Sequence, residues 1–368
     1  MKKDSPIRLI DAQTVSHLRS QTIYHALAYA MKPGAPDTVV LSRPGSRYAC
    51  VGFHQDAARE LDLDFCRAQH IPVIRRETGG GTVLIDPNQI FVQWIFQPEH
   101  LPRKIDTRFQ LFVKPLIETY QFFGIKAYAF PPNDVHVNGK KIVGTGAAAI
   151  GNAEVVTGNF MLDFDVATMA DILRVPNEPF RDLFRQSLDS YLTSMKKELG
   201  IVPDLEELKR VYGEKCRTAI GRPLEPGAFT QEELDWMESL DAKFSSEEWL
   251  LEIRKPPAPE RLVKVHAGVW IGDVSYMAGE KEIRATIRTR DNRIDRIALA
   301  DSALVDPPAR ARGMENALHN VEMEEEDLRE VLEAFFELHS ASTPGISPDD
   351  WIGMILKMKR AKLKMSGG

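Results

Sequence analysis

The stretch Arg75-Arg76-Glu77-Thr78-Gly79-Gly80-Gly81-Thr82-Val83, called the glycine loop below, decides how the rest of this sequence is interpreted. Two arginines run directly into three glycines. Arginine offers a planar set of donors that suits carboxylates and phosphates. Glycine lets the backbone approach a ligand closely and turn its amide groups toward an anion. The stretch therefore predicts a loop that binds an anionic small molecule.

The spacing of the glycines excludes two common nucleotide-binding motifs. The string is neither Gly-x-Gly-x-x-Gly, the dinucleotide pattern, nor Gly-x-x-x-x-Gly-Lys-[Ser/Thr], the P-loop pattern. A flexible turn between two strands is the plain structural alternative. Because three glycines cost conformational entropy on folding, and because arginines are an odd choice beside a simple turn, a functional loop is favoured.

Two polar motifs follow downstream. Asn133-Asp134 supplies a carboxylate, a hard oxygen ligand that suits Mg²⁺ beside a nucleotide, although a surface turn is the alternative. Lys140-Lys141 follow Asn138-Gly139, which is a favoured two-residue hairpin turn. Adjacent strand residues face opposite sides, so one lysine is expected to face a developing negative charge and the other to face solvent. Protection of an edge strand is the plainer role for both lysines.

Composition indicates an ordinary globular protein of two domains. The chain has 368 residues, a net charge of −6 and 43% hydrophobic residues. No stretch of about 20 apolar residues could span a bilayer, and the N-terminus lacks the apolar run of a signal peptide. Three cysteines form neither a disulfide framework nor a metal motif. We expect a cytoplasmic protein that binds neither nucleic acid nor a membrane.

Hydrophobic periodicity predicts an α+β fold. Helices are expected at 12–31, 64–70, 105–124 and, with breaks, from 165 to 239. Strands are expected at 38–41, 48–53, 71–74, 82–85, 90–96, 135–143, 155–156 and 160–162. Because most strands precede most helices, we expect a large domain with a mixed or antiparallel sheet flanked by helices.

A second, smaller domain is predicted after a change in composition. Residues 254–259 are rich in proline, which is typical of a semi-rigid linker. We expect a catalytic domain at 1–250, a linker at 251–261 and a small α/β accessory domain at 262–368. Its expected strands are 262–265, 283–289 and 294–299, followed by a helix at 324–338. The basic tail at 357–364 is expected to be solvated and frayed, with a docking patch as the alternative.

No protein nucleophile can be identified in the sequence. The nine histidines are scattered, Cys50 is expected to be a buried small hydrophobe, and no Ser/His/Asp or Cys/His arrangement is present. This absence is consistent with acyl adenylation, in which a substrate carboxylate attacks the α-phosphorus of ATP and expels pyrophosphate. Such an enzyme supplies positioning and positive charge rather than a nucleophile.

These motifs together resemble the lipoate–protein ligases, within the wider biotin/lipoate ligase and octanoyltransferase superfamily. The family pattern is Arg-Arg-x-Ser/Thr-Gly-Gly-Gly-Ala-Val, then Asn-Asp, then Gly-x-Lys-Ile/Val-Ser-Gly. This sequence has Arg75–Val83, Asn133-Asp134 and Gly139–Gly144 in the same order and spacing. The resemblance covers residues 1–250, and a weaker match to the family's accessory domain runs from Val263 to Phe336.

The resemblance implies a role for each matching residue. Lys141 would be the catalytic lysine that holds the α-phosphate and the activated carbonyl, and Lys140 would face outward. Asp134 would hold Mg²⁺, with Asn133 near the adenylate. Val83 would pack on the lipoyl chain. The other residues implied to line the lipoyl and adenylate channel or to flank the adenylate are Arg76, Thr78, Gly79, Gly80, Gly81, Gly144 and Thr145.

The implied reaction is ATP-dependent and uses Mg²⁺. Lipoate is activated to lipoyl-AMP and then transferred to a lysine of a lipoyl domain or another lipoate-carrier protein, while the accessory domain helps to close the site. Octanoyl or lipoyl transfer from a carrier, which requires a thiol in the related cysteine enzymes, is one alternative. A non-catalytic homologue that binds lipoate or the carrier is another. Biotin ligation is disfavoured, because the arginine–glycine string typical of those enzymes is absent.

Three short segments depart from the family pattern. Ile85-Asp86 stands where the family has His-Asp, Asn88-Gln89 where it has Gly-Asn, and Thr157-Gly158-Asn159 where it has His-Gly-Thr. The residues implied to handle ATP are retained, so we expect adenylation to be retained too. The departures concern the fit to the acyl group or the acceptor, as in a specialised ligase for a dedicated lipoate-carrier protein of sulfur oxidation.

Overall fold

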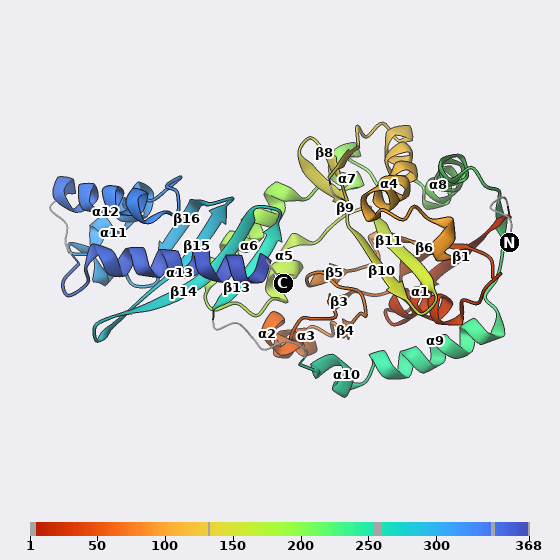
Figure 1. The fold of residues 1–368 in the computed structure, drawn as a ribbon, viewed down its shortest axis with the longest axis horizontal. Coiled ribbons are helices and arrows are strands. Elements are labelled where there is room, and N and C mark those ends of the chain that lie inside the picture. The colour runs from red at the N-terminus through yellow and green to blue at the C-terminus, as the bar shows by residue number, and fades with distance from the viewer. Residues whose placement is uncertain (1–4, 132, 254–259, 340–342, 367–368) are drawn as a thin grey trace. The chain divides into compact units, whose positions relative to one another are not determined.

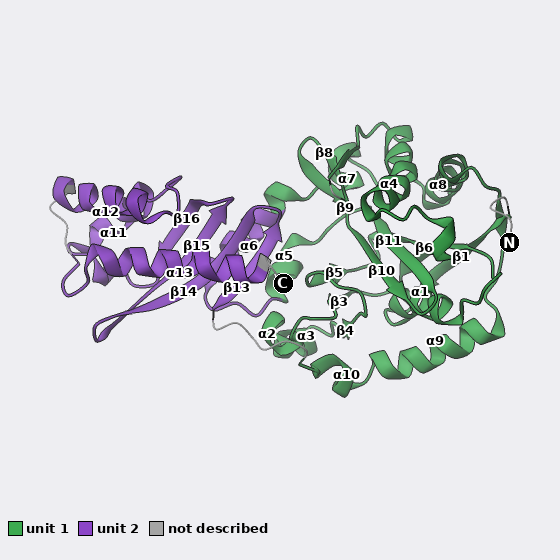
Figure 2. Cartoon of the chain, viewed as in Figure 1, with its two compact units in different colours: residues 1–172, 189–255 green, residues 173–188, 256–368 purple. Residues whose placement is uncertain are grey.

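The computed structural model of the chain describes residues 5–131, 133–253, 260–339 and 343–366. It contains two compact units, shown in Figure 2. The first comprises residues 1–172 and 189–255, and the second comprises residues 173–188 and 256–368. The expected domain boundaries stay a prediction, and the proline-rich stretch 254–259 lies outside the described residues.

A six-stranded mixed sheet forms the centre of the first unit (Figure 1). Its strand order is β10-β11-β6-β2-β1-β12. Strand β1, next to the edge strand β12, pairs in parallel with β2 and β12, whereas the remaining pairs are antiparallel. The expected mixed sheet is therefore confirmed. The strands are β1 (Ile7–Val15), β2 (Thr38–Pro44), β6 (Gln89–Phe96), β10 (Thr145–Ile150), β11 (Ala153–Met161) and β12 (Leu224–Pro226).

Two three-stranded sheets carry the polar motifs. The first of these sheets has the strand order β4-β3-β5, with β3 (Tyr48–Val51) at its centre. The glycine loop joins the outer strands β4 (Val73–Arg75) and β5 (Val83–Ile85). The other has the order β7-β8-β9, with bounds Tyr128–Phe130, Asp134–Val137 and Lys140–Val143. Asn138 and Gly139 join β8 to β9 with φ angles of 50° and 79°. Two positive φ angles are what a two-residue type I′ turn needs, so the expected hairpin is confirmed.

Helices cover both faces of the six-stranded sheet. On one face, α4 (Ile105–Phe122) and α8 (Leu205–Ile220) pack on a core that includes Trp94, whose indole N–H donates to Tyr212 Oη at 2.9 Å. On the other, α1 (Arg19–Ala30) and α9 (Gln231–Phe244) enclose a second core with β3, β4 and β5. The shorter helices of the first unit are α2 (Ala57–Glu60), α3 (Leu63–Ala68), η1 (Pro98–His100), α5 (Val166–Asp171), α7 (Met195–Leu199) and α10 (Glu247–Leu251). Most of α6 (Glu178–Tyr191) belongs to the second unit.

Strand alternation makes the two sheet faces chemically different. Along β6, Trp94 and its alternate neighbours belong to the core under α4 and α8. The opposite side of the same strand carries Gln89 and Gln93, which are buried amides. Polar side chains buried in a core need hydrogen-bond partners. The side of the sheet that faces the glycine-loop sheet is therefore the side that carries buried polar groups.

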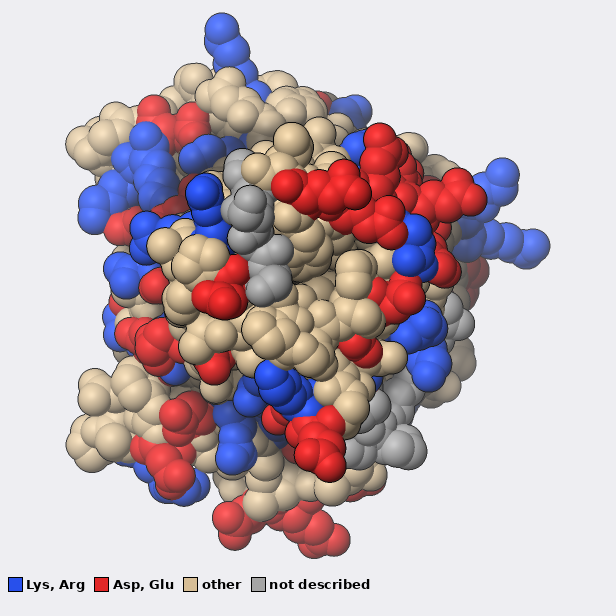
Figure 3. All heavy atoms as spheres, turned by 90° about the vertical axis from the view of Figure 1, so that its left-hand side faces the viewer, with Lys and Arg blue, Asp and Glu red and all other residues tan. Residues whose placement is uncertain are grey.

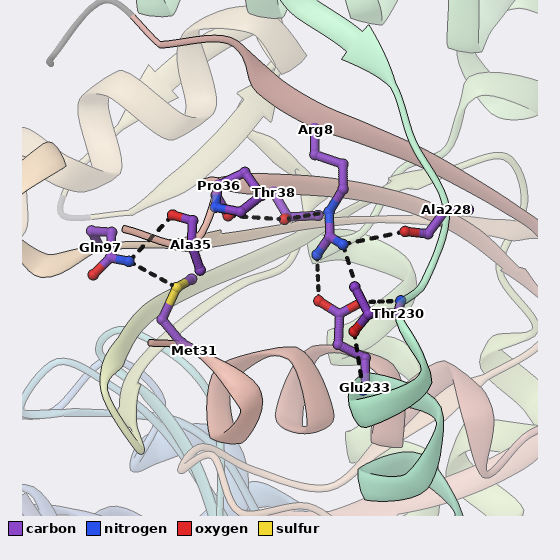
Figure 4. A network of polar contacts seen from close by, with 9 residues as sticks. All are labelled: Arg8, Met31, Ala35, Pro36, Thr38, Gln97, Ala228, Thr230 and Glu233. Carbon is purple, nitrogen blue, oxygen red and sulfur yellow. Dashed lines mark hydrogen bonds and ion pairs between the residues drawn. The ribbon is translucent and has the colours of Figure 1, made fainter. Parts of the chain in front are cut away.

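Arg8 on β1 connects the sheet to the start of α9 (Figure 4). Its guanidinium donates to Glu233 Oε2 at 3.1 Å, to Thr38 Oγ1 at 3.1 Å and to Ala228 O at 3.2 Å. Glu233 also accepts from the backbone N–H of Thr230 at 2.8 Å, and the Thr230 hydroxyl accepts from the backbone N–H of Glu233. This capping box and the ion pair share one carboxylate, so Glu233 holds both the helix end and the strand.

Two adjacent glutamates of α9 give a matched stability test. Glu233→Ala should lower the free energy of unfolding by about 2–4 kcal/mol, because a nearly buried Arg8 loses its carboxylate and α9 loses its cap. Glu232→Ala removes an ion pair to Lys32 whose side chains are 48% and 67% exposed, so it should cost less than about 0.5 kcal/mol. Urea unfolding of both variants checks this. Equal losses would contradict the assigned role of Glu233.

The second unit is built on an antiparallel sheet. Its strands are ordered β13-β14-β15-β16, and α13 packs on β14. The strands are β13 (Arg261–His266), β14 (Val269–Ala278), β15 (Lys281–Arg290) and β16 (Arg293–Leu299), and the helices are η2 (Ser302–Leu304), η3 (Pro308–Arg310), α11 (Ala311–Ala317), α12 (Glu325–His339) and α13 (Pro348–Ser366). The face shown in Figure 3 carries acidic and basic side chains together, with one larger gathering of acidic groups. Such a mixture is typical of a solvated surface.

Two sequence expectations about the chain ends were wrong. The predicted helix at 12–31 begins only at Arg19, because Ile7–Val15 forms β1 between two parallel neighbours, and that pairing overrides the weak helical pattern. The tail at 357–364 is not frayed but lies inside α13, where Trp351 and Met358 are buried. Strands β7, β10, β12 and β14 were also missed. Within the described ranges, no helix has the length and apolar character to cross a membrane.

Candidate active site

Arg75, the first arginine of the glycine loop, has a structural role. It is fully buried, and its guanidinium donates to backbone carbonyls of Phe53 at 2.9 Å, Trp249 at 3.0 Å and Leu250 at 2.7 Å. The Trp249 indole donates back to Arg75 O at 2.9 Å. Arg75 thus fastens α10 and the end of β3 to the glycine loop, and its donors are directed at the chain rather than at a ligand.

Arg76 organises the glycine loop through hydrogen bonds to its backbone. Its guanidinium donates to Gly79 O at 2.8 Å, to Gly81 O at 2.8 Å and to Cys50 O at 3.3 Å. The three glycines are exposed, while Thr78 is buried and its carbonyl accepts from Phe53 N at 3.0 Å. The loop is therefore held by Arg76 and Thr78 and leaves its glycines at the surface, where a ligand could reach their backbone.

Gly52, at the end of β3, was missed by the sequence analysis although the loop depends on it. A Cβ atom on Gly52 would lie 2.1 Å from the carbonyl oxygen of Gly80. Gly80 itself has a φ angle of +95°, which favours glycine. Only a glycine at 52 lets the two backbones approach this closely. No pattern in the sequence around 52 marked it, because the contact joins positions 28 residues apart.

Two glycine substitutions test this close approach. Gly52→Ala should lower the free energy of unfolding by about 1–3 kcal/mol, because the added methyl group displaces the backbone of Gly80. Gly79→Ala meets no atom within 4 Å and has no positive φ, so it should change stability by less than about 0.5 kcal/mol. Thermal unfolding of the two variants measures the difference. If Gly52→Ala were as stable as Gly79→Ala, the loop would not be clamped at this point.

Glu77 links the glycine loop to two helices. Its carboxylate accepts from Tyr29 Oη at 2.7 Å and from Lys243 Nζ at 2.6 Å, and His25 Nε2 lies 3.9 Å away. Burial raises the pKa of Glu77, but the electrostatic effect of His25 and the hydrogen bonds from Lys243 and Tyr29 outweigh burial and hold that pKa below its ordinary value. Burial also lowers the pKa of His25 to about 4. Glu77 is therefore an ionised anchor of the loop at neutral pH.

The lowered pKa of Glu77 gives a pH-dependent prediction. A carboxylate whose pKa falls on folding contributes stability above its unfolded value of 4.5, and this contribution is lost as the pH falls through the folded value. Glu77→Gln should therefore be less stable than the wild type by about 1–3 kcal/mol at pH 7, and the difference should shrink below pH 4.5. Urea unfolding between pH 3 and 7 measures this difference in the free energy of unfolding. A difference that stays constant with pH would contradict the role of Glu77 as an ionised anchor.

Lys141 and Asp134 form the charged centre of the hairpin β8-β9. Lys141 Nζ lies 2.7 Å from Asp134 Oδ1, with side chains 23% and 18% exposed. Tyr191, at the end of α6, donates its hydroxyl to Asp134 Oδ2 at 3.1 Å. His136, also buried, places Nε2 4.0 Å from the same oxygen. Lys140 differs, because its ammonium contacts the exposed carbonyl of Asp189 at 3.2 Å. The sequence analysis identified Lys141 and Asp134 but not Tyr191.

The segment after Lys141 is held at successive positions. Thr145 exchanges two hydrogen bonds with Asn133, from Asn133 Nδ2 at 2.8 Å and to Asn133 O at 2.7 Å. Gly144 N donates to Asn159 Oδ1 at 3.0 Å. The structure thus brings Asn133, Gly144 and Thr145 together with the ion pair. Val83, on β5, is 41% exposed and belongs with the glycine loop.

The three cysteines are buried in the first unit. Burial raises the pKa of the Cys50 thiol, that of Cys66 to about 11 and that of Cys216 to about 12. A thiol of this kind is protonated at neutral pH and shielded from substrates, so none of the three has the properties of a nucleophile.

A family model for the lipoyl protein ligase A/B catalytic domain matches residues 19–217, more than half of this 368-residue chain. Two sequence relatives illustrate the range of the match. An octanoyltransferase, LipM, from Kyrpidia tusciae is 25% identical over 222 residues, covering 54% of this chain and 81% of the relative. A lipoate-protein ligase A subunit 1 from Thermoplasma acidophilum is 22% identical over 240 residues, covering 62% and 88%.

Solved structures share the fold. A bipartite lipoate protein ligase from Thermoplasma acidophilum, studied with its E2 lipoyl domain, superposes with a TM-score of 0.62 at 22% identity, covering 68% of this chain and 98% of that chain. A lipoate-protein ligase A bound with ATP gives 0.58 at 19% identity, covering 68% and 100%. At these identities the likeness establishes the fold, which confirms the expected α+β class.

Proposed function

This chain belongs to the lipoyl protein ligase A/B family, and we propose that it is an ATP-dependent lipoate–protein ligase. At family level the chemistry is that of a ligase or an acyltransferase. The observation that supports ligation most directly is a paired Lys141 and Asp134 beside residues Asn133 and Thr145, in a protein whose thiols are all buried. Activation of a carboxylic acid by ATP needs no protein nucleophile. It needs a cation that can move to the charge developing on the phosphate.

In the first step, the carboxylate of lipoate attacks the α-phosphorus of ATP, and pyrophosphate leaves. Lys141 leaves Asp134 and neutralises the charge that builds on the α-phosphate and the activated carbonyl. Asn133, Gly144 and Thr145 hold the segment that flanks the adenylate. The exposed amides of Gly79, Gly80 and Gly81 line the adenylate channel, with the loop shaped by Arg76 and Thr78. Val83 packs on the acyl chain.

Asp134 is the residue that would hold Mg²⁺. The chemistry of the site fits this ion, because one carboxylate with unused lone pairs suits a cation that is bound mainly by phosphate oxygens. Among the described residues, no group of three or more His, Cys, Asp or Glu side chains could hold a metal by itself. When bound, Mg²⁺ would supply positive charge to the phosphates. Asp134 would supply one oxygen as Lys141 moves away.

In the second step, the amine of a carrier lysine attacks the acyl carbonyl, an amide forms and AMP leaves. We propose a lipoyl domain or another lipoate-carrier protein as the acceptor. A ligase with the same fold has been solved with an E2 lipoyl domain, and another has been solved with ATP, which supports this choice of partner and co-substrate. The accessory domain at 262–368 and the linker at 251–261 belong to this proposal, as does a reducing, cytoplasmic setting for the three free thiols.

Octanoyl or lipoyl transfer from a carrier is the competing activity, because a LipM octanoyltransferase is among the sequence relatives. A thiol-dependent transfer needs an accessible thiolate. Cys50 and Cys216 are 0% exposed and Cys66 is 1% exposed. This burial favours ligation. The two activities differ in a simple requirement, since a transferase works without ATP.

Substitution of the two neighbouring lysines tests the proposed chemistry. Lys141→Ala should lower lipoate-dependent release of pyrophosphate from ATP by about 100-fold to 1,000-fold, because the developing phosphate charge loses its cation. Lys140→Ala should retain activity within about threefold, because its ammonium donates to the exposed carbonyl of Asp189. The measurement uses ATP, Mg²⁺, lipoate and a panel of lipoyl domains, with mass spectrometry of the domains.

The outcomes separate the candidate functions. A mass gain on a lipoyl domain that requires ATP supports ligation. Acyl transfer from an octanoylated carrier without ATP would instead establish the transferase. Lipoate binding with neither reaction would establish a non-catalytic homologue. Unchanged turnover of Lys141→Ala would remove Lys141 from the mechanism.

A further inference from the structure

A chain of side-chain amides crosses the sheet beneath the candidate site. Gln89 Nε2 donates to Leu84 O at 3.2 Å, and Gln89 Oε1 accepts from Asn159 Nδ2 at 3.0 Å. Asn159 Oδ1 in turn accepts from Gly144 N at 3.0 Å. Gln89 and Asn159 are 4% and 6% exposed. Each amide is therefore a buried connector with a donor and an acceptor in use.

This amide relay joins the two halves of the site. Leu84 lies on β5, directly after the glycine loop, and Gly144 lies between β9 and β10, three residues after Lys141. Gln89 lies on β6 and Asn159 on β11, and these strands pair so that Asn159 is opposite Phe91. Gln89 and Asn159 are diagonal neighbours on one sheet face, within reach of each other. The distance between the glycine loop and the lysine segment is thus set through two buried amides.

Gln89 and Asn159 both lie where this sequence departs from the family pattern. Residues 88–89 are Asn-Gln where the family pattern has Gly-Asn. Residues 157–159 are Thr-Gly-Asn where the pattern has His-Gly-Thr. The structure shows that these two departures touch each other. Their hydrogen bond gives each buried amide a partner, and a buried amide left without one is costly.

We propose that Asn159 is a positioning residue for the adenylation of lipoate. Gln89 orients Asn159, and Asn159 fixes Gly144, and hence Lys141, relative to the glycine loop. The proposal rests on the ligase function proposed above. In this proposal Asn159 acts through the backbone N–H of Gly144, which donates to its side-chain oxygen. Its loss should therefore misplace the catalytic lysine more than it weakens substrate binding.

Single and double substitutions test the order of the relay. Asn159→Ala should lower the single-turnover rate of lipoyl-AMP formation by about 10-fold to 100-fold, with the KM for ATP changed by less than about threefold. Gln89→Ala should have a smaller effect. The double variant should match Asn159→Ala within about twofold, because Gln89 acts through Asn159. Asn159→Asp keeps an acceptor for Gly144 N, so its rate should lie nearer to the wild type.

A buried amide at the other end of β6 provides the matched control. Gln97 donates to Met31 Sδ and Ala35 O (Figure 4), and it has no bond to the relay residues among its contacts in the described chain. Gln97→Ala should lower the melting temperature as a buried amide loss does, yet it should leave the rate of adenylation within about twofold of the wild type. If Gln97→Ala and Asn159→Ala lost adenylation rate equally, the loss would come from general destabilisation. That result would overturn the positioning role of Asn159.

Amide hydrogen exchange gives a readout that needs no turnover. Exchange at Gly144 should speed up at least 10-fold in Asn159→Ala and less in Asn159→Asp. If the wild-type protein made no lipoyl-AMP, the ligase proposal would fail. The exchange rate at Gly144 would still test the amide relay. If wild-type protein were active but Asn159→Ala kept full rate and slow exchange, the relay would be overturned. Additive rate losses in the double variant would also overturn it.

Discussion

The ion pair between Lys141 and Asp134 is the interaction on which the site depends. A lysine on the return strand of a hairpin would normally extend into solvent, where its position is undefined. Here Asp134 holds Lys141 Nζ at 2.7 Å, and Tyr191 holds the other oxygen of Asp134. Because both partners are partly shielded, the pair stores a cation at a defined position. In the proposed mechanism, the developing charge of the adenylate draws this cation away from Asp134.

The fold provides this site by placing short sheets beside a large one. The glycine loop joins β4 to β5, and the hairpin β8-β9 carries Lys141. The loop depends on a close backbone approach, and the hairpin depends on two positive φ angles in its turn. Gly52 lets the chain after β3 pass close to the carbonyl of Gly80, and Arg76 donates to the carbonyl of Gly79. The buried amides Gln89 and Asn159 then connect the two segments across β6 and β11. Strands therefore carry Asp134 and Lys141 directly and hold both ends of the glycine loop.

Local patterns in the sequence predicted the parts of the structure that short-range chemistry determines. Asn138-Gly139 specifies its turn by φ angles alone, and the hairpin was predicted correctly. Strand β1 was not, because its stability comes from parallel pairing with β2 and β12, and β12 lies more than 200 residues away. The same holds for Tyr191, whose hydroxyl meets Asp134 across 57 residues. The sequence does not distinguish the roles of the adjacent Arg75 and Arg76. In the structure Arg75 is fully buried and holds α10, whereas Arg76 holds the glycine loop.

The central claim is that Lys141 is held by Asp134 until an acyl adenylate claims it. A crystal structure with a non-hydrolysable lipoyl-adenylate analogue, in which a sulfamoyl group replaces the phosphate, measures this directly. The account predicts Lys141 Nζ within about 3.2 Å of a sulfamoyl or acyl oxygen and more than about 4 Å from Asp134 Oδ1. An analogue bound at the glycine loop with the ion pair to Asp134 still intact would contradict it.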